Sequence, residues 1–191
     1  MPPDQDVTRW LRQMTAGEPE ALDRVVSLLY DELRAMARKR LANERGGHTL
    51  SATAVVNEVY LKLAKHHRIS APDRTRFLAV AATTMRRVLV DHARTRRREK
   101  RGGGEAAVPL DQVENLLSDS EAEEILALDD ALTRLAEINP RGAEVVQQRF
   151  YAGLSLEETA ALLNVSAKTV QRDWIAARAW LRKEVSRELE G

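Results

Sequence analysis

The stretch LSLEETAALLNVSAKTVQRDWIAARAWL, residues 154–181, is typical of two short amphipathic helices separated by a tight turn. Ser155 and Glu158 match a capping box, in which each side chain bonds a backbone N–H that the first helical turn leaves unpaired. Asn164 suits the left-handed conformation that often ends a helix, and Ser166 can cap the helix that follows. The stretch therefore predicts a helix-turn-helix, an arrangement that can present its second helix to the major groove of DNA.

The second helix of this stretch has two chemically different faces. Its apolar residues recur at helical spacing and are expected to be buried: Val170, Trp174, Ala177 and Leu181. The opposite face carries Lys168, Gln171, Arg172 and Ile175. Lysine and arginine bind phosphate or guanine, glutamine can pair with adenine, and isoleucine can contact a thymine methyl group. The face is therefore a candidate DNA-reading surface, and an ordinary helical hairpin with a solvated charged face is the alternative.

The composition favours a helical protein that works without a cofactor. The chain has 191 residues, of which 43% are hydrophobic and only 4% aromatic, and strand-like alternation is missing. Cysteine is absent, which excludes disulfides and thiolate metal sites and favours the cytoplasm. The four histidines lack metal-ligand spacing, and no segment resembles a signal peptide or a membrane span. We therefore expect an all-α fold with no metal, cofactor, membrane or small-molecule substrate.

Charge is distributed unevenly along the chain. Residues 1–104 contain 21 Lys and Arg against 12 Asp and Glu, whereas residues 105–191 contain 9 against 17. Residues 94–101, RTRRREKR, are a run that suits a nucleic-acid backbone. Residues 105–130 hold nine acidic residues and no Lys or Arg. The first half is therefore expected to bind a polyanion, and the acidic tract is expected to fold back on the basic run when DNA is absent.

Helical periodicity and turn signals divide the chain into elements. The pattern predicts helices over residues 7–14, 18–41, 51–65, 74–98, 121–138 and 140–152, with a loop over 43–49. Three glycines, Gly102 to Gly104, follow the basic run and mark a boundary. We therefore expect two small helical domains, residues 1–101 and 121–191, joined by a flexible acidic linker over 102–120.

Three segments together resemble the extracytoplasmic-function (ECF) sigma factors of bacterial RNA polymerase. The segment NEVYLKL, residues 57–63, resembles the family's helix that docks on the clamp helices of the polymerase's largest subunit. The segment FLAVAATTMRRVLVDHARTRRR, residues 77–98, is similar to the part that recognises and opens the −10 promoter element. Residues 155–181 look like the helix-turn-helix that reads the −35 element. Their order and spacing make the resemblance specific over nearly the whole chain.

The resemblance implies partners and site residues. The partners would be core RNA polymerase and promoter DNA, and an anti-sigma factor is left open. Contacts with the −35 element are expected from Ser166, Lys168, Thr169, Gln171, Arg172, Ile175 and Arg178. Contacts with the −10 element are expected from Arg86, Arg87, His92, Arg94, Arg97 and Arg98. Polymerase contacts are expected from Asn57, Glu58, Leu61 and Lys62. Asp173 stands where the family's recognition helix often has a basic residue, which predicts a weaker contact with the DNA backbone.

Two other functions compete with this interpretation. A free-standing transcriptional regulator would bind paired DNA half-sites tightly without polymerase. An enzyme is the second alternative, but the histidines and the pair Asp91 and His92 beside arginines do not form a catalytic or metal-binding pattern. We therefore expect a cytoplasmic sigma factor that directs promoter recognition, DNA opening and transcription initiation, and that is not an enzyme.

Overall fold

The fold of the described residues is entirely helical, as the sequence predicts. The computed structural model of the chain describes residues 3–18, 20–41, 48–65, 69–100 and 117–190, and within these ranges there is no strand. The helices are α1 (Pro3–Ala16), α2 (Ala21–Leu28), α3 (Tyr30–Arg40), α4 (His48–Ala64), α5 (Arg74–Lys100), α6 (Asp119–Ile138), α7 (Pro140–Val146), the π-helical turn η1 (Gln147–Tyr151), α8 (Leu156–Leu163) and α9 (Ala167–Glu190).

Several helix boundaries differ from those predicted. The single helix expected over 18–41 is wrong, because the chain is interrupted at Leu29, where φ is −101° and ψ is 11°. No proline or glycine stands at this break, so nothing in the local sequence indicates it. Leu29 itself is only 2% exposed and packs in the core. The loop expected over 43–49 is also partly wrong, since α4 begins at His48, and residues 42–47 lie outside the described ranges. Such errors are common at helix ends, where the periodic signal is weakest.

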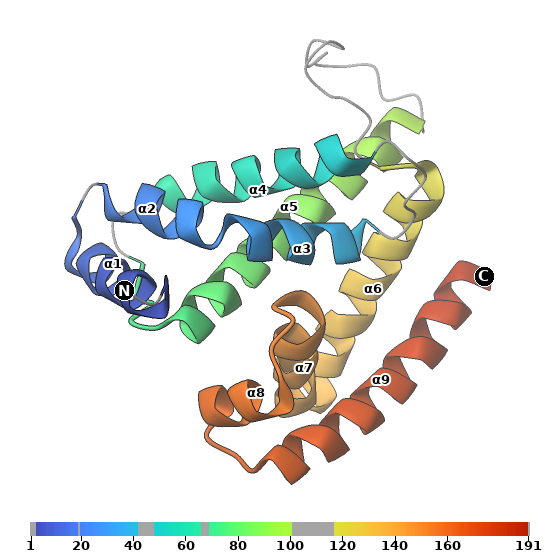
Figure 1. The fold of residues 1–191 in the computed structure, drawn as a ribbon. Helices are drawn as coiled ribbons and strands as arrows, with labels where there is room; N and C mark the ends of the chain where they lie inside the picture. Colours follow the sequence, from blue (N-terminus) through green and yellow to red (C-terminus); the bar gives the residue numbers. More distant parts are fainter. Residues whose placement is uncertain (1–2, 19, 42–47, 66–68, 101–116, 191) are drawn as a thin grey trace.

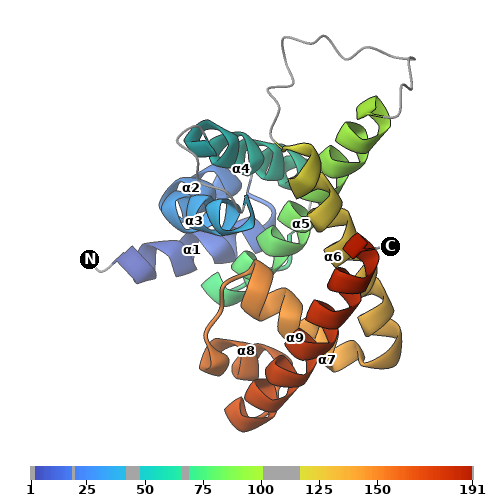
Figure 2. The same ribbon diagram turned by 90° about the vertical axis from the view of Figure 1, so that its right-hand side faces the viewer.

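The amino-terminal helices are organised around α5. Helix α5 crosses α3 in Figure 1, and Figure 2 shows α2, α3 and α4 together on one side of it. Helices α3 and α4 pack against α5, and α1 packs against α2 and α5. Phe77, Ala81, Met85 and Val88 recur at helical spacing along α5 and are all buried. This spacing forms an apolar stripe along one side of the helix, which packs into the core. The other sides of α5 are left for charged residues and for α6.

The carboxy-terminal helices begin with well-defined caps. Ser118 and Glu121 form a capping box at the start of α6, and Asn139 with Pro140 starts α7. Helix α9 packs against α6, α7 packs against both of them, and α8 packs against α9 (Figure 2). The π-helical turn η1 then brings Phe150 and Tyr151 towards the amino-terminal half, against α5.

The two halves of the described chain pack against each other. The most extensive contact between helices is that of α5 with α6. Buried apolar residues form one continuous cluster that extends from Val7 in α1 to Leu181 in α9. A smaller cluster of Val145, Ala160 and Val170 lies beneath α8 and α9. The division into domains at residues 101 and 121 stays a prediction, and most of the expected linker lies outside the described residues.

Candidate nucleic-acid and protein interfaces

The helix pair α8 and α9 has the local geometry that its sequence predicts. The backbone N–H of Glu158 donates to Ser155 Oγ at 3.0 Å, and the N–H of Ser155 donates to Glu158 Oε2 at 2.7 Å. Asn164 ends α8 in the left-handed region with φ of 52°. The N–H of Thr169 donates to Ser166 Oγ at 3.1 Å, which caps the start of α9. The predicted capping box, left-handed turn residue and second cap are therefore confirmed.

The outward face of α9 is polar and open. Ile175 is 60% exposed, so its side chain is open to contact with a partner. The predicted residues on this face that are exposed are Ser166, Lys168, Gln171, Arg172, Ile175 and Arg178, while Thr169 is half-buried. On the inner face Val170, Ala177 and Leu181 are buried and Trp174 is half-buried. The structure thus brings the predicted −35 residues together on one surface.

Asp173 does not lie on the outward face of α9, and the weaker contact with the DNA backbone expected at its position stays a prediction. Its side chain is only 9% exposed, and Arg141 Nε in α7 donates to its Oδ2 at 2.5 Å. The Asp173 carboxylate also raises the pKa of Arg141 through this hydrogen bond. Arg172 Nε also lies 3.6 Å from Asp173 Oδ1, so two neighbouring cations offset the charge of this acid. Asp173 is therefore a packing partner for α7.

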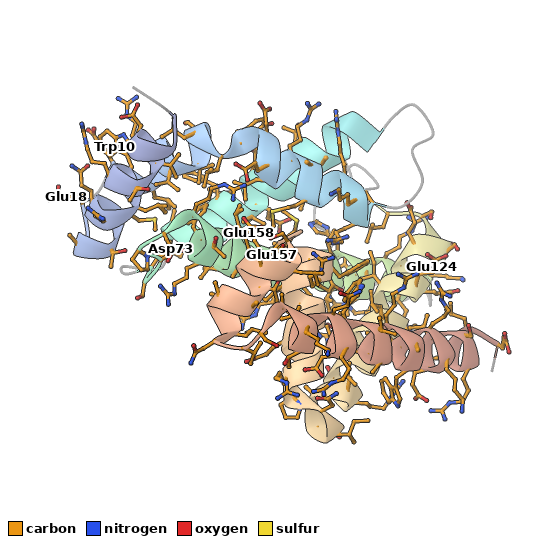
Figure 3. The ribbon with its side chains drawn as sticks, turned by 60° about the horizontal axis from the view of Figure 1, so that its bottom comes forward. Trp10, Glu18, Asp73, Glu124, Glu157 and Glu158 are labelled. Atoms are coloured by element: carbon orange, nitrogen blue, oxygen red, sulfur yellow. The ribbon has the colours of Figure 1, made fainter. Side chains whose placement is uncertain are left out.

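Glu158 connects the helix pair to the amino-terminal half. Its Oε1 accepts a hydrogen bond from Arg74 at 3.2 Å, and Arg74 also pairs with Glu32 in α3. Figure 3 labels Glu158 on the side of α8 that faces α3 and α5. The hydrogen bond from the Ser155 backbone, followed by those from its side chain and by Arg74, lowers the pKa of Glu158. The carboxylate form is therefore favoured in the folded protein.

The lowered pKa of Glu158 predicts a pH-dependent contribution to stability. Because the folded state favours the carboxylate, the stabilisation is complete above the ordinary glutamate pKa of about 4.3 and is lost as the pH falls through the lowered value. We expect Glu158→Gln to reduce the free energy of unfolding at neutral pH, and this difference from wild type to shrink below about pH 4. Urea unfolding of the variant and of wild type, from neutral pH to below about pH 4, measures this difference in the free energy of unfolding. Glu157→Gln, an exposed neighbour, is the control, and an equal loss in both variants would contradict the prediction.

The predicted −10 residues on α5 have different environments. Arg87, Arg94, Arg97 and Arg98 are exposed. Arg86 is half-buried, since its Nε donates to Asp129 Oδ1 of α6 at 2.8 Å. A polar cavity of about 310 Å³ lies at this position, lined by Thr83, Arg86, Arg87, Val90, Asp91, Arg94 and Asp129. The basic face of α5 therefore lies partly open and partly against α6.

The predicted polymerase residues lie on α4 beside α5. Asn57 is exposed, and Leu61 is 56% exposed although it is apolar. Glu58 pairs with His92, and Lys62 Nζ lies 2.7 Å from Asp91 Oδ2. The structure thus joins His92, predicted to face DNA, to Glu58, predicted to face the polymerase. The exposed leucine and the ion pairs beside it are the groups that this surface of α4 offers to a partner.

Sequence reasoning missed the individual contacts between the acidic tract and α5. Asp119 pairs with Arg96 at 2.7 Å, Glu123 with Lys100 at 2.9 Å, and Asp129 with Arg86. It also missed Arg40, whose guanidinium lies 3.9 Å from the centre of the Phe150 ring. Burial lowers the pKa of Arg40 to about 10 and raises the pKa of Tyr151 beside it to about 12. The opposite charges of the basic run and the acidic tract were the only signal in the sequence for the ion pairs between them.

The described residues carry little that suggests other kinds of site. They include no group of three or more His, Asp or Glu placed to hold a metal ion. None of the helices in the described ranges is long and apolar enough to cross a membrane.

Comparison with known proteins places these surfaces in context. A sequence model of the family described as "ECF sigma factor" matches residues 4–187, nearly the whole chain. The match includes α4, α5, α8 and most of α9, and so covers all three candidate surfaces. No curated protein matches the chain significantly.

Proposed function

The chain belongs to the ECF sigma factor family, and we propose from this premise that each of its three surfaces has a separate role at the promoter. Membership confirms the resemblance carried by the three sequence segments. It gives the chain a role in transcription initiation, with core RNA polymerase and promoter DNA as partners. We assign −35 recognition to α9, −10 recognition and opening to α5, and polymerase binding to α4. The division into residues 1–101, 102–120 and 121–191 follows this assignment.

The exposed face of α9 is the observation that carries the −35 assignment. Arg172 has a side chain that is 72% exposed, and Gln171 beside it is exposed. Arginine and glutamine can each form paired hydrogen bonds with a base edge in the major groove. Among the cations of α9, Lys168 lies nearest the capped start of the helix, where we expect it to contact the DNA backbone. The exposed Ile175 suits contact with a thymine methyl group.

The −35 assignment predicts different effects for two exposed cations of α9. We expect Arg172→Ala to cost about 1–3 kcal/mol of promoter affinity and to relax preference at one −35 position, since it loses a base contact. Lys168→Ala should weaken binding to all promoters alike, because a phosphate contact carries no sequence information. Fluorescence anisotropy of holoenzyme on a panel of −35 variants measures both. Lys183→Ala, exposed farther along α9, is the control, and unchanged −35 preference in Arg172→Ala would refute the docking assignment.

The basic face of α5 supports a role at the −10 element. Arg87, Arg94, Arg97 and Arg98 are exposed along a single helix, so together they can follow a DNA backbone. His92 is half-buried against Glu58 and lies between this face and α4. On α4 the exposed Leu61 and Asn57, with Glu58 and Lys62, form the surface that we assign to the polymerase. Adjacent helices would then bind enzyme and promoter together.

Run-off transcription tests the proposed function as a whole. Core RNA polymerase is mixed with genomic fragments, with and without this protein, and transcripts are mapped to their start sites. We expect discrete transcripts only when the protein is present, and start sites that share sequence elements upstream. A protein that binds DNA tightly by itself but adds no transcripts would support the free-standing regulator instead.

A further inference from the structure

A groove in the carboxy-terminal half lies between α9 and the helices that it packs against. Helix α9 lies beside α6 in this half (Figure 1). The groove has a volume of about 440 Å³. The apolar and aromatic side chains that line it come from α6, α7, η1 and α9, namely Leu128, Val146, Phe150, Trp174, Leu181 and Val185. Small-molecule sites in proteins are typically clefts of about 300–1,000 Å³ with mainly apolar walls, so the groove has the size and lining of such a site.

Two arginines of α9 supply the charge of this groove. Among the described residues, the charged side chains that line it are those of Arg178 and Arg182. They stand four residues apart, so they share one side of the helix. Both are exposed, and within the described ranges neither has an ion-pair partner, whereas Arg134, Arg141 and Arg187 in the same half each pair with an acid. Two guanidinium groups at the groove are therefore free to bind an anion.

The aromatic walls of the groove are held in place by cations. Arg149 lies 5.6 Å from the centre of the Trp174 ring, and its Nη1 donates to the carbonyl of Leu154 at 2.6 Å. Arg40 lies 3.9 Å from the centre of the Phe150 ring. Walls that are already fixed lose little conformational freedom when a ligand binds, which favours affinity. The groove is therefore preformed.

We infer that this groove binds a small amphiphilic anion, namely a free carboxylate or sulfonate with a single apolar chain or ring system. Its apolar part would lie against Trp174 and Leu181, and its head group would bond Arg178 and Arg182. Burial of the apolar part supplies the affinity, and the two guanidinium groups select an anion over a cation. Such a molecule would be a bound ligand and not a substrate. Its binding requires neither DNA nor polymerase.

A ligand in the groove would also affect the surface of α9 that we assign to the −35 element, because Arg178 belongs to both. An anion bonded to the Arg178 guanidinium would compete with DNA for the same donors. The ligand and the −35 element would then weaken each other's binding. This consequence rests on the proposed function, whereas binding of the ligand does not.

Isothermal titration calorimetry of the full chain with decanoate tests the site. We expect one decanoate per chain, and much weaker binding of decyltrimethylammonium, which has the same chain length and the opposite charge. Arg182→Gln should weaken decanoate binding about fivefold, the order expected of a partly exposed charged pair, and Arg182→Lys should keep most of the affinity. Lys183→Gln is the matched control, since it removes the same charge from the next exposed residue, outside the lining. Equal loss in Arg182→Gln and Lys183→Gln, or equal binding of the two amphiphiles, would overturn the inference.

The position of the ligand is measured separately by nuclear magnetic resonance. In the wild-type protein, decanoate should shift the indole N–H resonance of Trp174, in the groove, but not that of Trp10, in α1. Val185→Trp adds a bulky apolar side chain at a half-buried lining position, so we expect it to reduce decanoate binding at least tenfold while the circular dichroism spectrum stays helical. Equal shifts at Trp10 and Trp174, or no binding of decanoate at all, would overturn the site and leave the groove to a protein partner.

Competition with DNA distinguishes the ligand site from the proposed function. Fluorescence anisotropy of the free protein on a −35 duplex is measured with and without saturating decanoate. We expect decanoate to weaken wild-type binding about fivefold, as the loss of one partly exposed charged contact would, and to have no further effect on Arg178→Ala. If decanoate binds at Trp174 but leaves DNA affinity unchanged, the ligand site stands and the assignment of Arg178 to the −35 element is contradicted.

Discussion

Leu61→Glu is expected to abolish retention of the protein by core RNA polymerase while leaving its fold unchanged. Leu61 is 56% exposed at the centre of the surface on α4 that we assign to the polymerase. A few residues near the centre of an interface cost about 2 kcal/mol or more when they are replaced, and we expect Leu61 to be one of them, so the affinity should fall by about 30-fold. A glutamate would also bury an unpaired charge in the complex. Co-purification with tagged core polymerase and thermal unfolding measure the two properties.

A matched control tests whether the effect depends on where the apolar residue is replaced by glutamate. Ile138 is 65% exposed at the end of α6, and Ile138→Glu introduces the same change outside the assigned surface. We expect this variant to bind the polymerase as wild type does. Normal retention of Leu61→Glu, or equal loss in both variants, would be incompatible with an interface centred on Leu61.

Asp173→Arg is expected to destabilise the packing of α9 against α7. The substitution places a second cation beside Arg141, at a position where the side chain is only 9% exposed. The lost ion pair itself contributes little because Arg141 is half exposed, so the main cost is the burial of a second cation beside the first. Urea unfolding gives the free energy, and promoter binding by holoenzyme should fall as α9 loses its support.

The control for this variant keeps the arginine but moves it to the surface. Ala176 is exposed three residues farther along α9, and Ala176→Arg should leave the free energy of unfolding within about 0.5 kcal/mol of wild type. If Asp173→Arg instead keeps full stability and gains DNA affinity, its side chain reaches the solvent. Asp173 would then lie on the DNA-facing side of α9, at the position where the family's recognition helix often has a basic residue.

Features that depend on residues within a few positions of each other could be predicted from the sequence. The capping box of Ser155 and Glu158, the left-handed Asn164 and the two faces of α9 are set by neighbouring side chains and backbone geometry. The same holds for the helical class of the fold, because the apolar period of a helix is a local property. The assignment to a family came from three such segments in order.

Only the tertiary structure decided which charged groups meet. Asp173 pairs with Arg141, 32 residues away, and Arg86 pairs with Asp129, 43 residues away. Charge runs in a sequence indicate that attraction exists, but each cation has many possible partners and the packing of helices selects one. The break at Leu29 also had no local signal, since neither proline nor glycine stands there. The sequence therefore determined the helices and their exposed chemistry, and tertiary packing decided whether that chemistry faces DNA or another helix.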